Sequence, residues 1–176
     1  MNSQKLSPRF LMLTGLIIVA AIVRLLPHPP NFAPIAAMAL FGGAYFNKKV
    51  FAFAIPLAAL FLTDLFLGFH NTMWAVYLSF IVIVGLGMVM LQKKSALRVV
   101  LASVSASVLF FIVTNFAFWA TDTLYPTTAA GLAACFTAAI PFFHNTLIGD
   151  LFFTGVMFGV FELAKAKFPE LVRVKV

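Results

Sequence analysis

Apolar residues run along this chain in long blocks, and short stretches rich in proline, asparagine or lysine separate one block from the next. Most blocks approach the ~20 residues that an α-helix needs to cross the hydrocarbon core of a bilayer. We therefore predict an all-α membrane protein with a single transmembrane domain over residues 1–176 and six transmembrane helices. The predicted spans cover about residues 10–26, 34–46, 50–67, 72–91, 97–120 and 142–165.

The last apolar block is too long for one span. A single helix over residues 129–165 would measure roughly 55 Å, against about 30 Å for the hydrocarbon core. Because proline interrupts helices, Pro141 is expected to divide the block. The sequence thus predicts a short extra helix over residues 129–140 in the outer leaflet before the last span, either re-entrant or interfacial.

Basic residues mark the same side of the membrane throughout. With six spans and both the N and C termini cytoplasmic, eleven of the 12 Lys and Arg residues lie inside and only Arg24 lies outside. This distribution follows the positive-inside rule. It explains the net charge of +7 as a topology signal, so the sequence does not predict a nucleic-acid partner.

Composition supports the membrane assignment. The chain is 63% hydrophobic and 10% charged, whereas soluble domains are about 45–50% apolar and about 25% charged. We expect a multi-pass protein of the bacterial cytoplasmic (inner) membrane. The basic and apolar N-terminus resembles a signal peptide, but without a convincing cleavage site it is interpreted as a retained first span. A single cysteine, Cys135, excludes an internal disulfide framework and is expected to be buried.

Polar residues gather at the outer ends of the predicted spans, whereas the inner half of the bundle is nearly all apolar. This pattern fits a binding cup open to the outside better than a channel, which needs polar groups along its length. The outer set comprises Arg24, His28, Asn31, Asp64, His70, Asn71, Asn115, Trp119, Asp122, Tyr125, His144, Asn145 and Asp150.

The segment 140–165 carries the densest polar group, with His144, Asn145, Thr146 and Asp150 in its first half. Ionisable groups inside a membrane segment are costly and indicate function. The sequence holds no HExxH pattern, paired cysteines, nucleophile–base set or phosphate-binding glycine loop. It therefore predicts neither an enzyme nor a bound cofactor or metal.

Each candidate also has a structural interpretation. Asp64 and Asp150 could pair with Arg24 or cap helices, and His144 and Asn145 could cap the last span. The serines of the fifth span are expected to join helices. Interfacial roles are equally open for the remaining residues, namely His28, His70, Trp119 and Tyr125.

Two resemblances follow from particular strings. Residues 31–46, followed by Asp64, resemble the S components of energy-coupling-factor (ECF) vitamin transporters. Residues 31–37, 114–119 and 141–150 resemble an uncharacterised bacterial membrane-protein family, the DUF6580 group. The first resemblance implies a substrate-binding subunit whose partners are an ECF-type coupling subunit and ATPases.

We therefore expect an S-component-like protein that binds a small, vitamin-like solute from the outer side, with residues 121–130 as a lid. The alternative is a non-transporting scaffold subunit of the cell envelope. An ion-coupled carrier would need buried acids near the membrane midplane, and Asp64 and Asp150 are expected farther out. The predicted substrate contacts are Arg24, Asn31, Asp64, His70, Asn115, Trp119, Tyr125, His144, Asn145 and Asp150.

Overall fold

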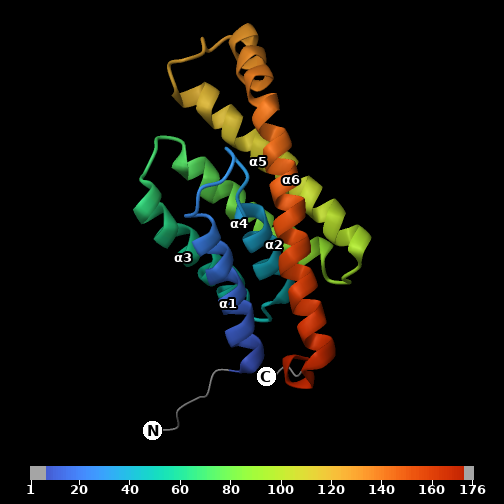
Figure 1. Cartoon of the computed structure of the whole chain (residues 1–176). Coiled ribbons are helices and arrows are strands. Elements are labelled where there is room, and N and C mark those ends of the chain that lie inside the picture. The colour runs from blue at the N-terminus through green and yellow to red at the C-terminus, as the bar shows by residue number, and fades with distance from the viewer. Residues whose placement is uncertain (1–6, 173–176) are drawn as a thin grey trace.

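The computed structural model describes residues 7–172, and this part of the chain is helical with no strand. Figure 1 shows the helices packed side by side in one elongated bundle. The expectation of an all-α protein is confirmed. The elements are α1 (Pro8–Val23), α2 (Ile35–Tyr45), α3 (Lys49–Leu67), α4 (Met73–Met90), α5 (Ala96–Thr121), α6 (Ala129–Lys167) and the 3-10 helix η1 (Pro169–Leu171).

Four helices, α3 to α6, are long and apolar enough to cross a membrane, and α1 and α2 are shorter apolar helices. Large apolar side chains point away from the bundle, including Phe66, Leu97 and Leu163, which are 80%, 68% and 74% exposed. Such surfaces suit contact with lipid rather than water. The protein is therefore a multi-pass membrane protein. Five of its six α-helices begin and end within about three residues of a predicted span.

The prediction of a separate outer helix before the last span is wrong, because α6 is one continuous helix of 39 residues with Pro141 inside it. Its first part packs along α5, where Phe136 and Phe143 both contact the ring of Phe111. Backbone groups in lipid must be satisfied within the helix, which favours continuation over a break. At about 1.5 Å per residue, α6 is roughly 58 Å long, and with α5 it extends beyond the other helices (Figure 1).

Helix α2 is the centre of the bundle. Nearly all of its side chains are buried, and it lies between α4 and α6. Glycines allow the close approach to α4, since a Cβ atom at Gly43 would collide with the carbonyl oxygen of Val84, and one at Gly87 would collide with that of Leu40. With 11 residues, α2 is only about 17 Å long, roughly half the thickness of a bilayer core.

The two described ends of the chain lie at the same end of the bundle. Arg9 donates hydrogen bonds to the carbonyl oxygens of Leu171 and Tyr45, at 3.0 and 2.9 Å. The Tyr45 hydroxyl donates to Glu162, which also pairs with Lys165. The connections 25–34, 68–72 and 122–128 lie toward the opposite, upper end of Figure 1. The bundle is therefore polar at two ends, and a cavity opens near the upper one.

Candidate functional site

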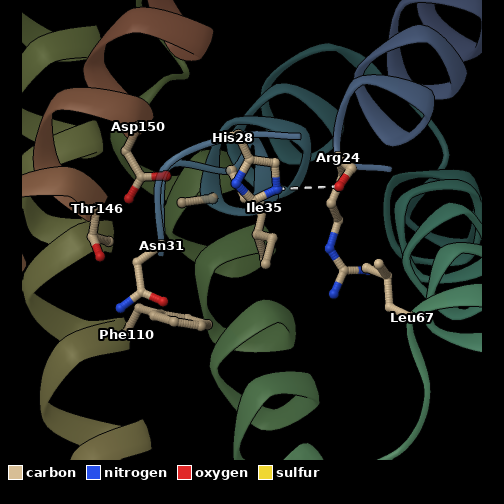
Figure 2. Close-up of a pocket in the computed structure, with 10 residues that line it drawn as sticks. Arg24, His28, Asn31, Ile35, Leu67, Phe110, Thr146 and Asp150 are labelled. Carbon is tan, nitrogen blue, oxygen red and sulfur yellow. Dashed lines mark hydrogen bonds between the residues drawn. The ribbon is translucent and has the colours of Figure 1, made fainter. Parts of the chain in front are cut away.

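A cavity of about 250 Å³ lies among the upper parts of five helices and the loop between α1 and α2. Figure 2 shows polar side chains approaching it from several of these elements. The lining residues are Arg24, His28, Asn31, Ala33, Ile35, Ala36, Leu67, Phe110, Thr146 and Asp150. We call this cavity the outer pocket, after the outer position that the predicted topology gives it.

The outer pocket exists because α2 begins only at Ile35, so a loop and not a helix follows α1 at this level of the bundle. Pro34 stands at its N-cap position, where no side chain accepts a hydrogen bond from the first turn. The preceding loop turns at Asn31, whose positive φ of 62° is a left-handed conformation that asparagine tolerates better than most residues. Asn145 on α6 donates to the carbonyl oxygen of Pro30 at 3.0 Å. The loop is thus fixed above the start of α2, and the space beside it stays open.

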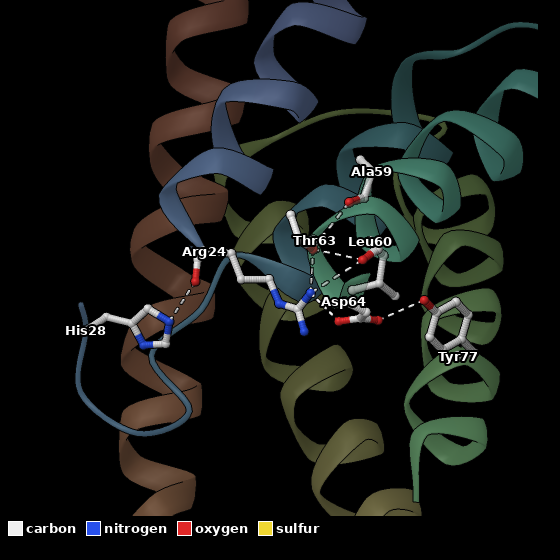
Figure 3. A network of polar contacts seen from close by, with 7 residues as sticks. All are labelled: Arg24, His28, Ala59, Leu60, Thr63, Asp64 and Tyr77. Atoms are coloured by element: carbon white, nitrogen blue, oxygen red, sulfur yellow. Dashed lines mark hydrogen bonds and ion pairs between the residues drawn. The ribbon is translucent and has the colours of Figure 1, made fainter. Parts of the chain in front are cut away.

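One wall of the pocket is an ion-pair network (Figure 3). The Arg24 guanidinium pairs with the Asp64 carboxylate at 2.5 Å and donates to the Thr63 hydroxyl at 2.5 Å. The Tyr77 hydroxyl donates to the other Asp64 oxygen at 2.8 Å. These contacts tie α1, α3 and α4 together and confirm the structural interpretation of Asp64 as the partner of Arg24. The charge of Arg24 is already balanced before any ligand binds.

His28 holds the loop beside this network. Its Nε2 lies 3.2 Å from the carbonyl oxygen of Arg24, and its Nδ1 lies 2.9 Å from that of Pro29. The ring is exposed and lines the pocket. Both of its ring nitrogens are therefore engaged by the backbone, whereas the Asn31 side chain also lines the cavity.

The opposite wall carries Asp150, which is only 2% exposed. The Ser107 hydroxyl on α5 donates to its Oδ2 at 2.7 Å. Ala36, in the first turn of α2, lines the same cavity as this carboxylate. Asp150 thereby provides the negative group that the N-terminus of α2 favours. Among residues 7–172, no Lys, Arg or His forms an ion pair with it.

The structure brings together only part of the predicted contact set. Arg24, Asn31 and Asp150 line the pocket, Asp64 lies directly behind Arg24, and Asn145 holds the loop without lining the cavity. The capping interpretation of His144 and Asn145 is wrong, because α6 begins at Ala129.

The other predicted contacts lie elsewhere. The Asn115 amide donates to the carbonyl oxygen of Phe111 on its own helix at 2.8 Å. Trp119 donates to Pro126 at 3.0 Å, in the loop that also holds Tyr125. His70 contacts the Thr72 hydroxyl in the turn between α3 and α4, and His144 is exposed on α6. Cys135 is buried as expected.

Sequence reasoning left seven lining residues out of the predicted contacts, namely His28, Ala33, Ile35, Ala36, Leu67, Phe110 and Thr146. His28 was among the outer polar residues and Thr146 was in the polar group of segment 140–165, so their residue types gave a signal. Leu67 and Phe110 are apolar residues in apolar helices, and only the fold distinguishes them. The resulting pocket combines a paired cation, a carboxylate, an amide, an imidazole and apolar walls, which suits binding and orienting a small polar molecule.

This chain belongs to a family of unknown function (DUF6580), whose profile matches residues 4–171. The family membership expected from residues 31–37, 114–119 and 141–150 is confirmed. No curated protein and no solved structure matches the chain.

Proposed function

We propose that this protein binds a small polar, vitamin-like solute in the outer pocket and serves its uptake, as an S-component-like subunit. The observation that carries this proposal is the pocket itself, with the Asp150 carboxylate and the Asn31 amide facing one cavity beside a short, buried helix. The volume of about 250 Å³ is just below the roughly 300–1,000 Å³ of typical drug-sized sites. The solute is therefore a small one.

The short α2 supports a transport role. Transporters commonly place substrates beside discontinuous helices that start within the membrane, where a helix N-terminus faces the site. Ile35 and Ala36, in the first turn of α2, line the outer pocket. Irregular backbone at membrane depth is tolerated where it lines a cavity, as the loop before α2 does here.

The proposed topology has six spans, with the loop 25–34 and α2 together forming the second crossing. Both termini are cytoplasmic, so the basic residues near the two described ends, such as Arg9 and Lys165, face the inside. Between Asp150 and Glu162, α6 rises roughly 18 Å. With Glu162, which accepts a hydrogen bond from Tyr45, at the inner edge of the hydrocarbon core of about 30 Å, Asp150 lies just past the midplane, in the outer half of a bacterial inner membrane.

The coupling partners follow from the resemblance alone. An ECF-type coupling subunit and ATPases would supply the energy for transport. The scaffold alternative predicts outer polar groups that face a protein neighbour. The inward orientation of Asp150, which is 2% exposed and lines the pocket, favours the binding role over the scaffold role.

Thermal unfolding of the detergent-purified protein with a panel of water-soluble vitamins and their precursors tests this function. One panel member should raise Tm in a saturable manner. Asn31→Gly removes the amide but keeps a residue that accepts the positive φ, so it should weaken that response at least several-fold. His70→Ala, away from the pocket, is the matched control and should respond as wild type. Equal responses in both variants would reject the pocket as the binding site.

A further inference from the structure

We propose that the contact between α5 and α6, directly beneath the outer pocket, holds a small monovalent cation of the sodium type. Its oxygen ligands are the Asp150 carboxylate and the hydroxyls of Ser107, Ser103 and Thr154. The proposed site rests on the register of two helices, on two hydroxyls without partners and on one carboxylate without an ion pair.

The register follows from contacts along α5 and α6. The Ser107 hydroxyl donates to Asp150, and the rings of Phe111 and Phe143 are in contact. The Cys135 thiol donates to the carbonyl oxygen of Asn115. The two helices run antiparallel, because later residues of α5 contact earlier residues of α6. Side chains four residues apart share one face of a helix. Ser103 therefore lies one turn below Ser107, and Thr154 lies one turn below Asp150, each close to the face that carries the contact between Ser107 and Asp150.

Both of these hydroxyls are buried without a partner. Ser103 is 0% exposed and Thr154 is 1% exposed, and neither side-chain oxygen makes a hydrogen bond. Helical Ser and Thr can usually bond the carbonyl one turn back, as Ser79 does to Ala75 at 2.7 Å. Buried hydroxyls without partners are costly. Two such hydroxyls, each one turn below a partner of the contact between Ser107 and Asp150, point to a bound species that supplies the missing contacts.

The charge of the site indicates a cation. Arg24 is engaged by Asp64, and within residues 7–172 no basic side chain pairs with Asp150. A single buried carboxylate balances one positive charge, and an unpaired buried charge is costly. Carboxylate and hydroxyl oxygens are hard ligands that suit hard cations. A water molecule would satisfy the hydroxyls but would bring no positive charge to the carboxylate.

A cation at this position would change the affinity for the solute. This role rests on the proposed function. Asp150 lines the outer pocket above and belongs to the cation site below. A cation bound there neutralises the carboxylate that the solute meets, so the two ligands change each other's affinity by the same factor. Cation binding itself requires no solute and is tested alone.

The test measures Tm of the purified protein in sodium, potassium or choline chloride at constant ionic strength. Sodium should give a saturable rise that choline does not, of roughly 5 °C at tenfold excess over its Kd. Ser103→Ala and Thr154→Val each remove one ligand with little change in shape, so each should raise the half-saturating sodium concentration about tenfold. Asp150→Asn should abolish the response.

Two control variants remove hydroxyls elsewhere. Thr14→Val removes a buried hydroxyl without a partner on α1, and Ser79→Ala removes a paired one on α4. Both should keep the wild-type sodium response. Equal Tm in sodium and choline, or a full response in Ser103→Ala and Thr154→Val, would overturn the cation site. The solute screen described above can succeed or fail independently of either result.

Discussion

Asp64 and Asp150 are buried to nearly the same extent, at 4% and 2% exposed, but their surroundings differ. Asp64 is held by the Arg24 guanidinium and the Tyr77 hydroxyl. Among the described residues, Asp150 has only a neutral hydrogen-bonding partner, the Ser107 hydroxyl. A buried charge that the fold already balances stabilises structure, whereas one that the fold leaves unbalanced is available to a ligand. Burial alone does not separate these two roles.

The largest expected effect is on stability, at Asp64. Asp64→Asn keeps the shape but leaves the Arg24 charge buried without its carboxylate, which typically costs about 3–5 kcal/mol. Tm should fall by more than about 6 °C. The double variant Arg24→Met/Asp64→Leu removes both charges and should recover most of the loss. If Asp64→Asn unfolds at the wild-type temperature, the ion pair has no structural role.

The corresponding change at Asp150 should affect binding instead. Asp150→Asn still accepts the hydrogen bond from Ser107, so Tm without ligand should change by less than about 4 °C. Loss of a charged hydrogen bond costs about 1.5–3 kcal/mol, which corresponds to a roughly 10- to 150-fold weaker Kd for the solute found in the screen. Calorimetric titration of wild type and variant measures this ratio. An unchanged Kd would remove Asp150 from the site.

Removing one hydroxyl beside each acid refines the comparison. Tyr77→Phe should lower the free energy of unfolding by about 1 kcal/mol and leave the solute Kd unchanged. Ser107→Ala should weaken solute binding several-fold, because it removes the side-chain donor that orients Asp150. Chemical denaturation and the same titration separate the two outcomes. If both variants weakened the solute Kd equally, Asp64 and Asp150 would both contribute to solute binding.

The smallest effects are expected at residues that face away from the pocket. Trp119→Phe loses one exposed hydrogen bond to Pro126, and His144→Ala changes an exposed side chain. Each should change stability by about 0.5 kcal/mol or less and change the solute Kd less than twofold. A larger change in Kd would extend the site to the end of α5 or the outer face of α6.

The sequence predicted the helices well because lipid imposes length and polarity on every span, and lysines mark where spans end. It failed at Pro141, where the local tendency to break a helix was outweighed by packing of Phe136 and Phe143 on α5. Whether a helix continues through a proline depends on contacts between residues far apart in the sequence. A local sequence pattern does not reveal those contacts.

The candidate site was predicted in part for a similar reason. Asp150 was identifiable because a carboxylate in an apolar span is costly. His144 lies six residues before it, a spacing that turns a helix by roughly 240° from the Asp150 face, so it faces outward. Leu67 and Phe110 carry no chemical signal, and only the way α3 and α5 pack brings them to the pocket.

Native mass spectrometry of the detergent-purified protein, incubated with the vitamin and precursor panel, tests the central claim most directly. At a ligand concentration close to the wild-type Kd, wild type and Trp119→Phe should each carry one discrete small-molecule adduct, and Asp150→Asn should carry it in a fraction several-fold smaller. An undiminished adduct in Asp150→Asn, or a wild-type spectrum that stays free of adducts with every panel member, would contradict solute binding at the outer pocket.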